Sequence, residues 1–168
     1  MQGIEVGIDE ILNCREKRVA IQNEIIKKYN KPVISFTMNI PGPIKTNNEI
    51  KAAFDIGKNL ILEKLKENNI EILEVQELNE NTGNELFISA NSSAEKIKDI
   101  TVTIEENSEL GRLFDIDVID VNFKKLSRKS FRKCLICERQ AQECGRSRKH
   151  SVEELQKKVE EILSKGAN

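Results

Sequence analysis

Tryptophan is absent from this chain of 168 residues, and aromatic side chains make up only 4% of it. Proteins that hold single-stranded nucleic acid by stacking its bases on rings need more aromatic residues than that. An excess of positive charge is missing as well, because 27 Lys and Arg are matched by 28 Asp and Glu. A chain with this balance is poorly suited to coating nucleic acid or an anionic membrane surface. We therefore expect no nucleic acid and no membrane among its partners.

Long apolar runs are also missing. No window of about 18 apolar residues could cross a membrane. Residues 1–5 do not resemble the start of a signal peptide, which opens with basic residues before an apolar run. We therefore predict a cytoplasmic protein. Its four cysteines are Cys14, Cys134, Cys137 and Cys144. In a reducing compartment we expect the clustered cysteines to bind metal or take part in chemistry rather than form disulfides.

The length predicts a single domain over residues 1–168. Hydrophobic residues at 38% suffice for a core, and the 33% of charged residues are interspersed, as on solvated helix faces. Apolar residues at helical spacing predict a helix over 8–29, which Pro32 ends. Residues 33–40 alternate apolar and polar side chains, as in a strand with one polar face.

We expect residues 33–119 to form the core sheet unit and residues 134–166 to form a Cys-rich segment with the C-terminal helix. The remaining predicted elements belong to these two parts. Asn47 or Asn48 can cap the next helix. A Ser92–Glu95 capping box and apolar spacings of three and four favour a helix through Ile104, although residues 100–104 also alternate like a strand. The other predicted elements are strands at 70–78, 86–90 and 113–119, a short hairpin partner at 124–126, and a helix from the Ser151–Glu154 capping box to Gly166.

The order strand, helix, strand, strand, helix, strand over residues 33–119 predicts an α+β fold with a ferredoxin-like βαββαβ sheet. In such a sheet the first and last strands lie side by side. Helices cover one face, and the other face is open. The N-terminal helix, the C-terminal helix and the Cys-rich segment are expected to flank this unit.

Asp115 and Asp117 stand two residues apart on the last of these strands, so their side chains point to the same face. Two neighbouring carboxylates repel each other unless a cation or a proton lies between them. Mg²⁺ binds one or two carboxylates together with phosphate oxygens, so the pair indicates a Mg²⁺ site for phosphoryl transfer. A solvated outer strand face is the alternative. Polar residues expected on the same side are Ser35, Thr37 and Asn39, with Glu105 and Glu106 nearby.

Three cysteines and the only histidine of the chain form the pattern Cys134-x₂-Cys137-x₆-Cys144-x₅-His150. Three thiolates and an imidazole are the ligands of a closed tetrahedral Zn²⁺ site. Such a site would attach the C-terminal helix to the sheet and leave no open position for chemistry. The alternatives are cysteines that merely pack beside a surface histidine, or a reactive thiol. Cys14 stands alone on the first helix and is expected in the core.

Basic residues gather in the C-terminal half of the chain. They could form a landing site for phosphates or an acidic partner, or serve solubility alone. We expect them to be separated in space from the acidic residues of the open sheet face. They are Arg112, Lys125, Arg128, Lys129, Arg132, Lys133, Arg146, Arg148 and Lys149.

Several segments, taken in order, resemble the CitX family, the citrate lyase holo-acyl-carrier-protein synthases. This chain has Ser108 and Glu109 where the family pattern usually has His-Pro before Leu-Gly-Arg, so no histidine is available at that point. The segments that carry the resemblance are Arg15 to Arg18 with Gln22, Val33 to Lys45, Leu110 to Val118, Leu126 to Arg128, Cys134 to Cys137, and Cys144 to Ser151.

The resemblance implies a nucleotidyltransferase. It would move phosphoribosyl-dephospho-CoA from its triphosphoribosyl precursor to a serine of the apo-citrate lyase acyl carrier subunit and release pyrophosphate. Asp115 and Asp117 would hold Mg²⁺, Arg112 would neutralise triphosphate charge, and Gly111 would let the backbone approach the nucleotide. Further binding residues would be Lys45, Arg146 and Arg148, beside Ser35, Thr37 and Asn39.

A second hypothesis keeps the cysteine cluster and the basic residues and leaves the aspartates without a role. The chain would then be a non-enzymatic, zinc-stabilised assembly module for a carrier protein. Transfer of a prosthetic group distinguishes the two hypotheses, because only the enzyme would change the mass of the carrier.

Overall fold

The computed structural model describes residues 1–166, and all elements named below lie in that range. No helix within it is long and apolar enough to cross a membrane. In chain order the elements are α1 (Ile8–Tyr29), β1 (Val33–Met38), α2 (Asn48–Glu67), β2 (Glu71–Glu80), β3 (Gly83–Asn91), α3 (Ala94–Glu106), the 3-10 helix η1 (Leu110–Leu113), β4 (Phe114–Ile119), α4 (Ala141–Ser147) and α5 (Val152–Gly166).

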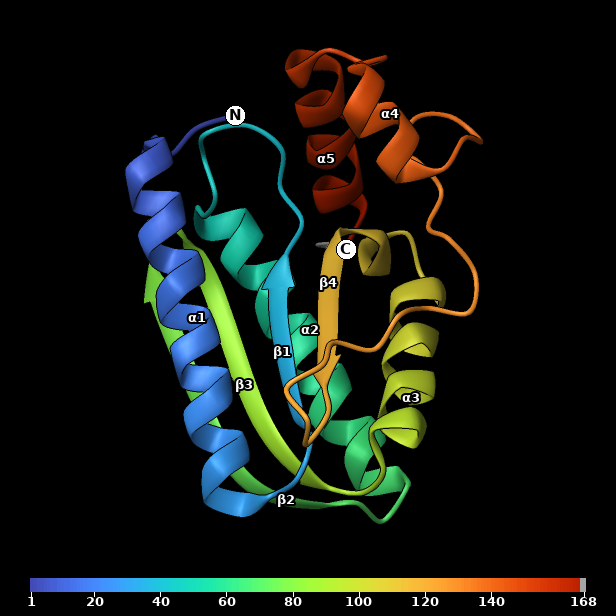
Figure 1. Ribbon diagram of the computed structural model, residues 1–168. Coiled ribbons are helices and arrows are strands. Elements are labelled where there is room, and N and C mark those ends of the chain that lie inside the picture. The colour runs from blue at the N-terminus through green and yellow to red at the C-terminus, as the bar shows by residue number, and fades with distance from the viewer. Residues whose placement is uncertain (167–168) are drawn as a thin grey trace.

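The strands form one sheet in the order β2-β3-β1-β4, and every neighbouring pair is antiparallel. The first and last strands of the unit are therefore neighbours, as the element order predicts, and the α+β class is confirmed. Helices α2 and α3 lie behind the sheet in Figure 1, while α1 crosses in front of it. Helices α4 and α5 lie together at the end of the sheet where β4 begins.

Most predicted elements agree with the structure. The differences are shifted element ends, a hairpin partner reduced to one bridge, and one helix that the sequence did not predict. The helix over 8–29 is confirmed, and residues 97–104 are helical rather than extended. The cap of α3 is Ser93, whose Oγ accepts the N–H of Lys96 at 3.2 Å, and not Ser92, where the chain is still leaving β3. Only an isolated bridge from Lys125 to Ile119 stands where a hairpin partner was expected. Helix α4, which has no apolar periodicity, was not predicted.

The prediction that one face of the sheet is open is wrong for much of that face. Ile25 and Ile26 of α1 pack on it with Val33, Phe87 and Ile119 in a second apolar cluster. The same helix also covers part of the polar face of β1. Gln22 Nε2 donates to Ser35 Oγ at 2.9 Å, and both side chains are buried. Sequence periodicity shows that α1 has an apolar side, but it does not show which surface that side covers.

The main core lies between the sheet and helices α2, α3 and α5. Phe36 of β1 stacks on Phe54 of α2 with ring centroids 4.9 Å apart, and Phe114 of β4 meets Phe36 edge-on at 5.3 Å. Gly57 of α2 faces these rings. A Cβ atom there would lie 2.5 Å from Phe36 Cζ and 3.0 Å from Phe114 Cζ. The aromatic cluster thus fixes the distance between α2 and strands β1 and β4, which carry the polar site on their other face.

Gly57→Ala is therefore expected to destabilise the protein although alanine is the better helix former. The clash costs about 3 kcal/mol, and the gain in helix propensity returns about 1 kcal/mol, which leaves a net loss of about 2 kcal/mol. Thermal unfolding should show a Tm lower by roughly 5 °C. Gly145→Ala is the matched control, because nothing lies within 4 Å of a Cβ at that helical glycine. A Tm of Gly57→Ala at or above that of the wild type would contradict this account of the packing.

Candidate active site

The two aspartates lie where the strand pattern places them. In the register of β4 with β1, Asp115 is opposite Thr37 and Asp117 is opposite Ser35. Burial and repulsion from Asp115 raise the pKa of Asp117 above its usual range, although Lys125, with Nζ 3.8 Å from Asp117 Oδ2, opposes the shift. A carboxylate pair of this kind is stabilised by any cation that binds between its members.

Two cavities share Asp115 in their linings. The larger, about 440 Å³, contains both Asp115 and Asp117 in its lining. The smaller, about 160 Å³, is enclosed by α1, β1, β4 and the turn between β2 and β3, and Asp115 belongs to its lining too. Thr37, Asn39 and Lys45 line the smaller cavity. The basic side chains that line the cavities are Lys98, Lys125, Arg128, Lys129 and Arg132 in the larger, with Arg15, Arg18 and Lys45 in the smaller.

Lys45, one of the predicted binding residues, lines the smaller cavity together with Asp115. Its Nζ donates to the carbonyl of Ile40 at 2.7 Å, which turns the side chain back across the turn after β1. Burial lowers the pKa of Lys45, and the positive charge of Arg15 lowers it further. Two cations held this close favour a bound anion.

Glu85 and Arg18 form a second acidic and basic pair in the smaller cavity, which sequence reasoning did not assign to the site. Glu85 of β3 is opposite Thr37 in the sheet register, so it shares a row with Asp115. It is buried, pairs with Arg18 Nε and accepts the thiol of Cys14 at 3.2 Å. Cys14 is buried, as predicted, yet its partner is polar. The available signal was a charged residue directly before the apolar run 86–88 of a central strand.

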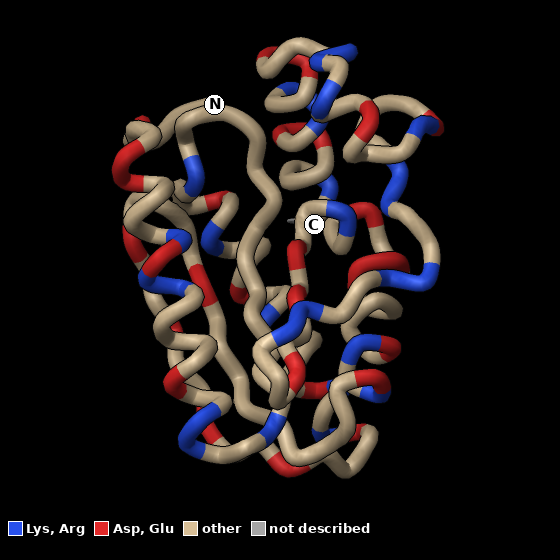
Figure 2. Tube along the Cα trace, in the orientation of Figure 1, with Lys and Arg blue, Asp and Glu red and all other residues tan. Residues whose placement is uncertain are grey.

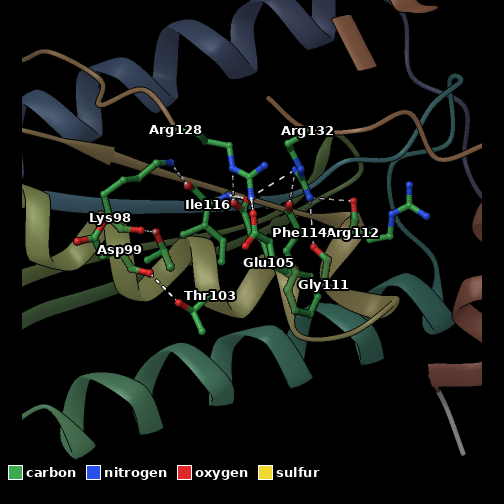
Figure 3. Close-up of polar contacts among 12 residues, drawn as sticks. Lys98, Asp99, Thr103, Glu105, Gly111, Arg112, Phe114, Ile116, Arg128 and Arg132 are labelled. Carbon is green, nitrogen blue, oxygen red and sulfur yellow. Dashed lines mark hydrogen bonds and ion pairs between the residues drawn. The ribbon is translucent and has the colours of Figure 1, made fainter. Parts of the chain in front are cut away.

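Glu105 closes the outer edge of β4 (Figure 3). Its Oε2 accepts the N–H of Ile116 at 3.0 Å. Lys98, which lies on the same face of α3, donates to the carbonyl of Ile116 at 3.1 Å. Arg128 and Arg132 each approach the Glu105 carboxylate to 3.6 Å. Burial raises the pKa of Glu105, and the charge of Arg132 opposes this. Side chains thus satisfy an edge strand that would otherwise expose unpaired backbone groups.

Arg132 fixes the start of β4. Its guanidinium donates to the carbonyls of Phe114 at 2.8 Å, Arg112 at 3.1 Å and Gly111 at 3.2 Å (Figure 3). Three backbone acceptors and one buried carboxylate place this arginine in the wall of the larger cavity as a positioning residue. From the sequence it was only one of a group of basic residues.

Two predicted site residues have other partners. Arg112 donates through Nη2 to the carbonyl of Cys134 at 2.6 Å and lines neither cavity. A Cβ at Gly111 would lie 2.6 Å from the carbonyl oxygen of Ile104 and 2.7 Å from that of Glu105. The close packing of η1 on α3 therefore requires this glycine whether or not a nucleotide is near.

The basic residues are not segregated from the acidic ones, so that prediction is wrong. Arg128 pairs with Glu106 at 3.1 Å, and Lys129 lies 3.7 Å from Asp99. Figure 2 shows both signs side by side along α3 and the loop that follows β4. Alternating charges of this kind neutralise each other locally. Two further predicted binding residues, Arg146 and Arg148, are exposed at the end of α4 and line neither cavity.

The Cys-rich segment forms a compact cluster. The ligand atoms of Cys134, Cys137, Cys144 and His150 all lie within 4.8 Å of one another, so the cluster could hold a metal ion such as zinc. A hydrogen bond with His150 lowers the pKa of Cys137 to about 6, and burial raises the pKa of Cys144 to about 11. The cluster lies beside α4 and α5, and none of its four members lines either aspartate cavity.

Paired carboxylates beside cation-lined cavities are typical of proteins that bind phosphates. The sequence profile of the apo-citrate lyase phosphoribosyl-dephospho-CoA transferase family, CitX, matches residues 6–166. The chain belongs to this family.

Individual relatives agree with the profile over nearly their whole length. A Vibrio cholerae protein named a probable apo-citrate lyase phosphoribosyl-dephospho-CoA transferase is 40% identical over 164 residues, which cover 95% of this chain and 92% of the relative. Proteins with the same name, without that qualifier, are 34% identical over 162 residues in Citrobacter koseri and 33% identical over 163 residues in an Escherichia coli strain. These two alignments cover 94% and 95% of this chain, and 88% and 89% of the relatives.

Proposed function

We propose that the chain transfers phosphoribosyl-dephospho-CoA from its triphosphoribosyl precursor to a serine of the apo-citrate lyase acyl carrier subunit. The observation that carries the proposal is the Asp115–Asp117 pair, which lines one cavity with basic side chains and contributes Asp115 to a second. The names of the relatives describe those proteins as phosphoribosyl-dephospho-CoA transferases of apo-citrate lyase, which supports the proposal. A triphosphate is a polyanion, and the larger cavity has the volume of ordinary ligand sites.

The reaction would be a nucleotidyl transfer. The serine oxygen forms a bond to the α-phosphorus of the precursor, the bond from that phosphorus to pyrophosphate breaks, and the serine proton passes to a base. Little of the rate has to come from covalent chemistry of the protein, because positioning and charge neutralisation dominate such transfers. Positive charge near the phosphates would come from Lys45 and Arg15 in the smaller cavity and from Lys125 in the larger one.

We propose Asp115 and Asp117 as the residues that hold Mg²⁺, which would neutralise charge on the phosphates when bound. The raised pKa of Asp117 supports this assignment. Burial and the charge of Asp115 disfavour its ionised form, and a bound cation would offset both effects. Thr37, Asn39 and Lys45 are proposed to bind phosphate oxygens in the smaller cavity. For Arg112, Arg146 and Arg148, a direct role would need the precursor or the carrier to extend beyond the two cavities.

We also propose that the sheet is of the ferredoxin-like type. The order β2-β3-β1-β4 with antiparallel neighbours supports it, together with helices α2 and α3 on one shared face. In this arrangement the strand residues that face the cavities come from three neighbouring strands, β3, β1 and β4.

Release of pyrophosphate tests the proposed activity. We expect release when this protein, Mg²⁺, the precursor and the apo carrier are combined, and none when the carrier is left out. A carrier whose modified serine is replaced by alanine should also give none. The assembly-module hypothesis predicts no release in any mixture, and that result with an intact precursor would reject the transferase.

Lys45→Gln should weaken binding of the precursor more than it slows the chemical step. It removes one charge from the smaller cavity while the glutamine can still reach the carbonyl of Ile40, so we expect KM to rise about tenfold, in line with the loss of one charge-assisted hydrogen bond. Steady-state kinetics with varied precursor gives the measurement. Lys157→Gln, on the exposed side of α5, is the matched control. An unchanged KM in Lys45→Gln would exclude Lys45 from the binding site.

A further inference from the structure

The chain between β4 and the middle of α5 lacks an apolar core of its own. From residue 120 to residue 158, a stretch that the structure describes completely, only Cys134 and Cys144 are buried. Large apolar side chains in this stretch, such as Phe123, Phe131 and Ile136, are exposed. A segment that buries so little apolar surface cannot offset the entropy of ordering its backbone. Something other than hydrophobic packing must hold it.

The two buried residues belong to the Cys134, Cys137, Cys144 and His150 cluster, and its dimensions suit one tetrahedral ion. With Zn–S bonds of about 2.3 Å, two thiolate ligands of a tetrahedral site lie about 3.8 Å apart. In the structure Cys137 Sγ is 3.4 Å from Cys144 Sγ and 3.4 Å from His150 Nε2, and all four ligand atoms lie within 4.8 Å of one another. All three cysteines are free thiols.

The groups around the cluster also fit a metal site. His150 directs Nε2 toward Cys137, while its Nδ1 lies 3.5 Å from the carboxylate of Glu154, four residues along the chain. Metal-bound histidines usually donate their second nitrogen to such a carboxylate. The N–H of Ile136 approaches Cys134 Sγ at 3.5 Å, as expected beside a thiolate. Cys134 and Cys137 lie in the loop, Cys144 lies in α4 and His150 lies just before α5, so one ion would join these three parts of the chain.

The cluster is linked by backbone contacts to the wall of the aspartate cavity. The carbonyl of Cys134 accepts the guanidinium of Arg112, and the N–H of Ala141 donates to the carbonyl of Arg132 at 2.8 Å. Arg132 in turn holds the backbone of η1 and the start of β4. Gln140 and Ala141, which precede Cys144, line the larger cavity with Arg132. The position of the cavity wall therefore depends on the position of the cluster.

We propose that Cys134, Cys137, Cys144 and His150 bind one structural Zn²⁺, which fixes the segment 124–142 as the wall of the aspartate cavity. Thiolate and imidazole ligands favour zinc over the oxygen-binding Mg²⁺. Four protein ligands leave no open coordination position, so the ion takes no part in a chemical step. The metal site stands independently of the transfer reaction, and its tests do not use that reaction as a readout.

Elemental analysis of the full chain, purified without chelator, tests the metal site. We expect one zinc per chain in the wild type and a content lower by about tenfold or more in Cys137→Ser, since a serine hydroxyl is a poor zinc ligand. Cys14→Ser, which removes the one cysteine outside the cluster, should keep one zinc per chain. Replacing zinc by Co²⁺ in the wild type should give the thiolate-to-cobalt absorption of a tetrahedral site, which does not depend on how the variants fold.

Two outcomes would overturn the metal site. One is a wild-type chain that stays essentially free of zinc after incubation with Zn²⁺ and removal of the excess. The other is a chain whose intact mass shows the loss of two hydrogens, with a disulfide between Cys137 and Cys144 in place of metal. Equal zinc content in Cys137→Ser and the wild type would also reject the assigned ligands.

Hydrogen exchange tests the coupling to the cavity. Removing the metal with a chelator should accelerate amide exchange in residues 124–142, whereas exchange in α2, which packs in the main core, should stay unchanged. Re-addition of Zn²⁺ should restore protection. Unchanged exchange in 124–142 after the metal has been removed would show that the ion does not hold the cavity wall.

Discussion

Replacing either Asp115 or Asp117 by asparagine is expected to lower the turnover of prosthetic-group transfer by about 10²- to 10³-fold, the loss seen when one preorganised charge-stabilising group is removed from an active site. Asparagine keeps the size of the side chain but removes the charge that would hold a cation against the phosphates. Transfer rates with saturating precursor provide the measurement. Asp55→Asn is the matched control, because Asp55 is paired with Lys51 on α2 and lines neither cavity.

The same substitutions should not harm the fold, which separates a functional aspartate from a structural one. Burial and the charge of Asp115 raise the pKa of Asp117 in the folded protein. A carboxyl whose pKa is higher in the folded than in the unfolded chain reduces stability as the pH rises from its unfolded value, about 3.9, through its folded value. The Tm of Asp117→Asn relative to wild type should therefore increase between pH 4 and pH 7. Near-normal turnover in both variants would refute the proposed role of the pair.

Glu105→Ala should have the largest effect on stability, a loss of about 3 kcal/mol in the free energy of unfolding. The carboxylate is buried between Arg128 and Arg132 and accepts the N–H of Ile116. Its removal leaves that buried donor unpaired and takes the buried counter-charge away from two partly buried guanidinium groups. The Tm should fall by roughly 6 to 12 °C. Chemical denaturation gives the free energy directly.

Two further variants, Glu105→Gln and Glu106→Ala, show whether the loss of the buried network causes the destabilisation of Glu105→Ala. Glu105→Gln retains an acceptor for Ile116 and should be less destabilising than the alanine variant. Glu106→Ala removes an exposed carboxylate that also pairs with Arg128, at 3.1 Å, and should cost less than about 1 kcal/mol. If Glu105→Ala and Glu106→Ala cost the same, the edge of β4 does not depend on the buried carboxylate.

The parts of this fold that follow from local pattern were predictable. Ile8 to Tyr29 has helical spacing and a proline after it, and the alternation after Val33 fixes which residues share a strand face. The neighbours of that face were not predictable, because the cover that α1 provides over Ser35 depends on tertiary packing. Helix α4 was missed for a related reason, since its buried residue is a cysteine and not part of an apolar stripe.

The candidate site divides in the same way. The Asp115 and Asp117 pair and the proximity of the Cys-His cluster follow from short spacings in the sequence. The place of Thr37 beside Asp115 follows from the predicted order of the strands. Long basic side chains have many reachable acceptors, so spacing could not show that Arg112 meets a carbonyl while Arg132 holds the cavity wall. Glu85 was missed because the predicted strand begins at residue 86, whereas β3 begins at Gly83 and so includes Glu85.

The intact mass of the apo carrier subunit tests the central claim most directly. The carrier is incubated with the precursor, Mg²⁺ and the wild type, Asp55→Asn or Asp115→Asn, and weighed after equal times. We predict a gain equal to the mass of one phosphoribosyl-dephospho-CoA group with the wild type and with Asp55→Asn, and almost none with Asp115→Asn. An unchanged carrier mass with the wild type and an intact precursor would contradict the proposed function, and an equal gain with all three proteins would contradict the proposed site.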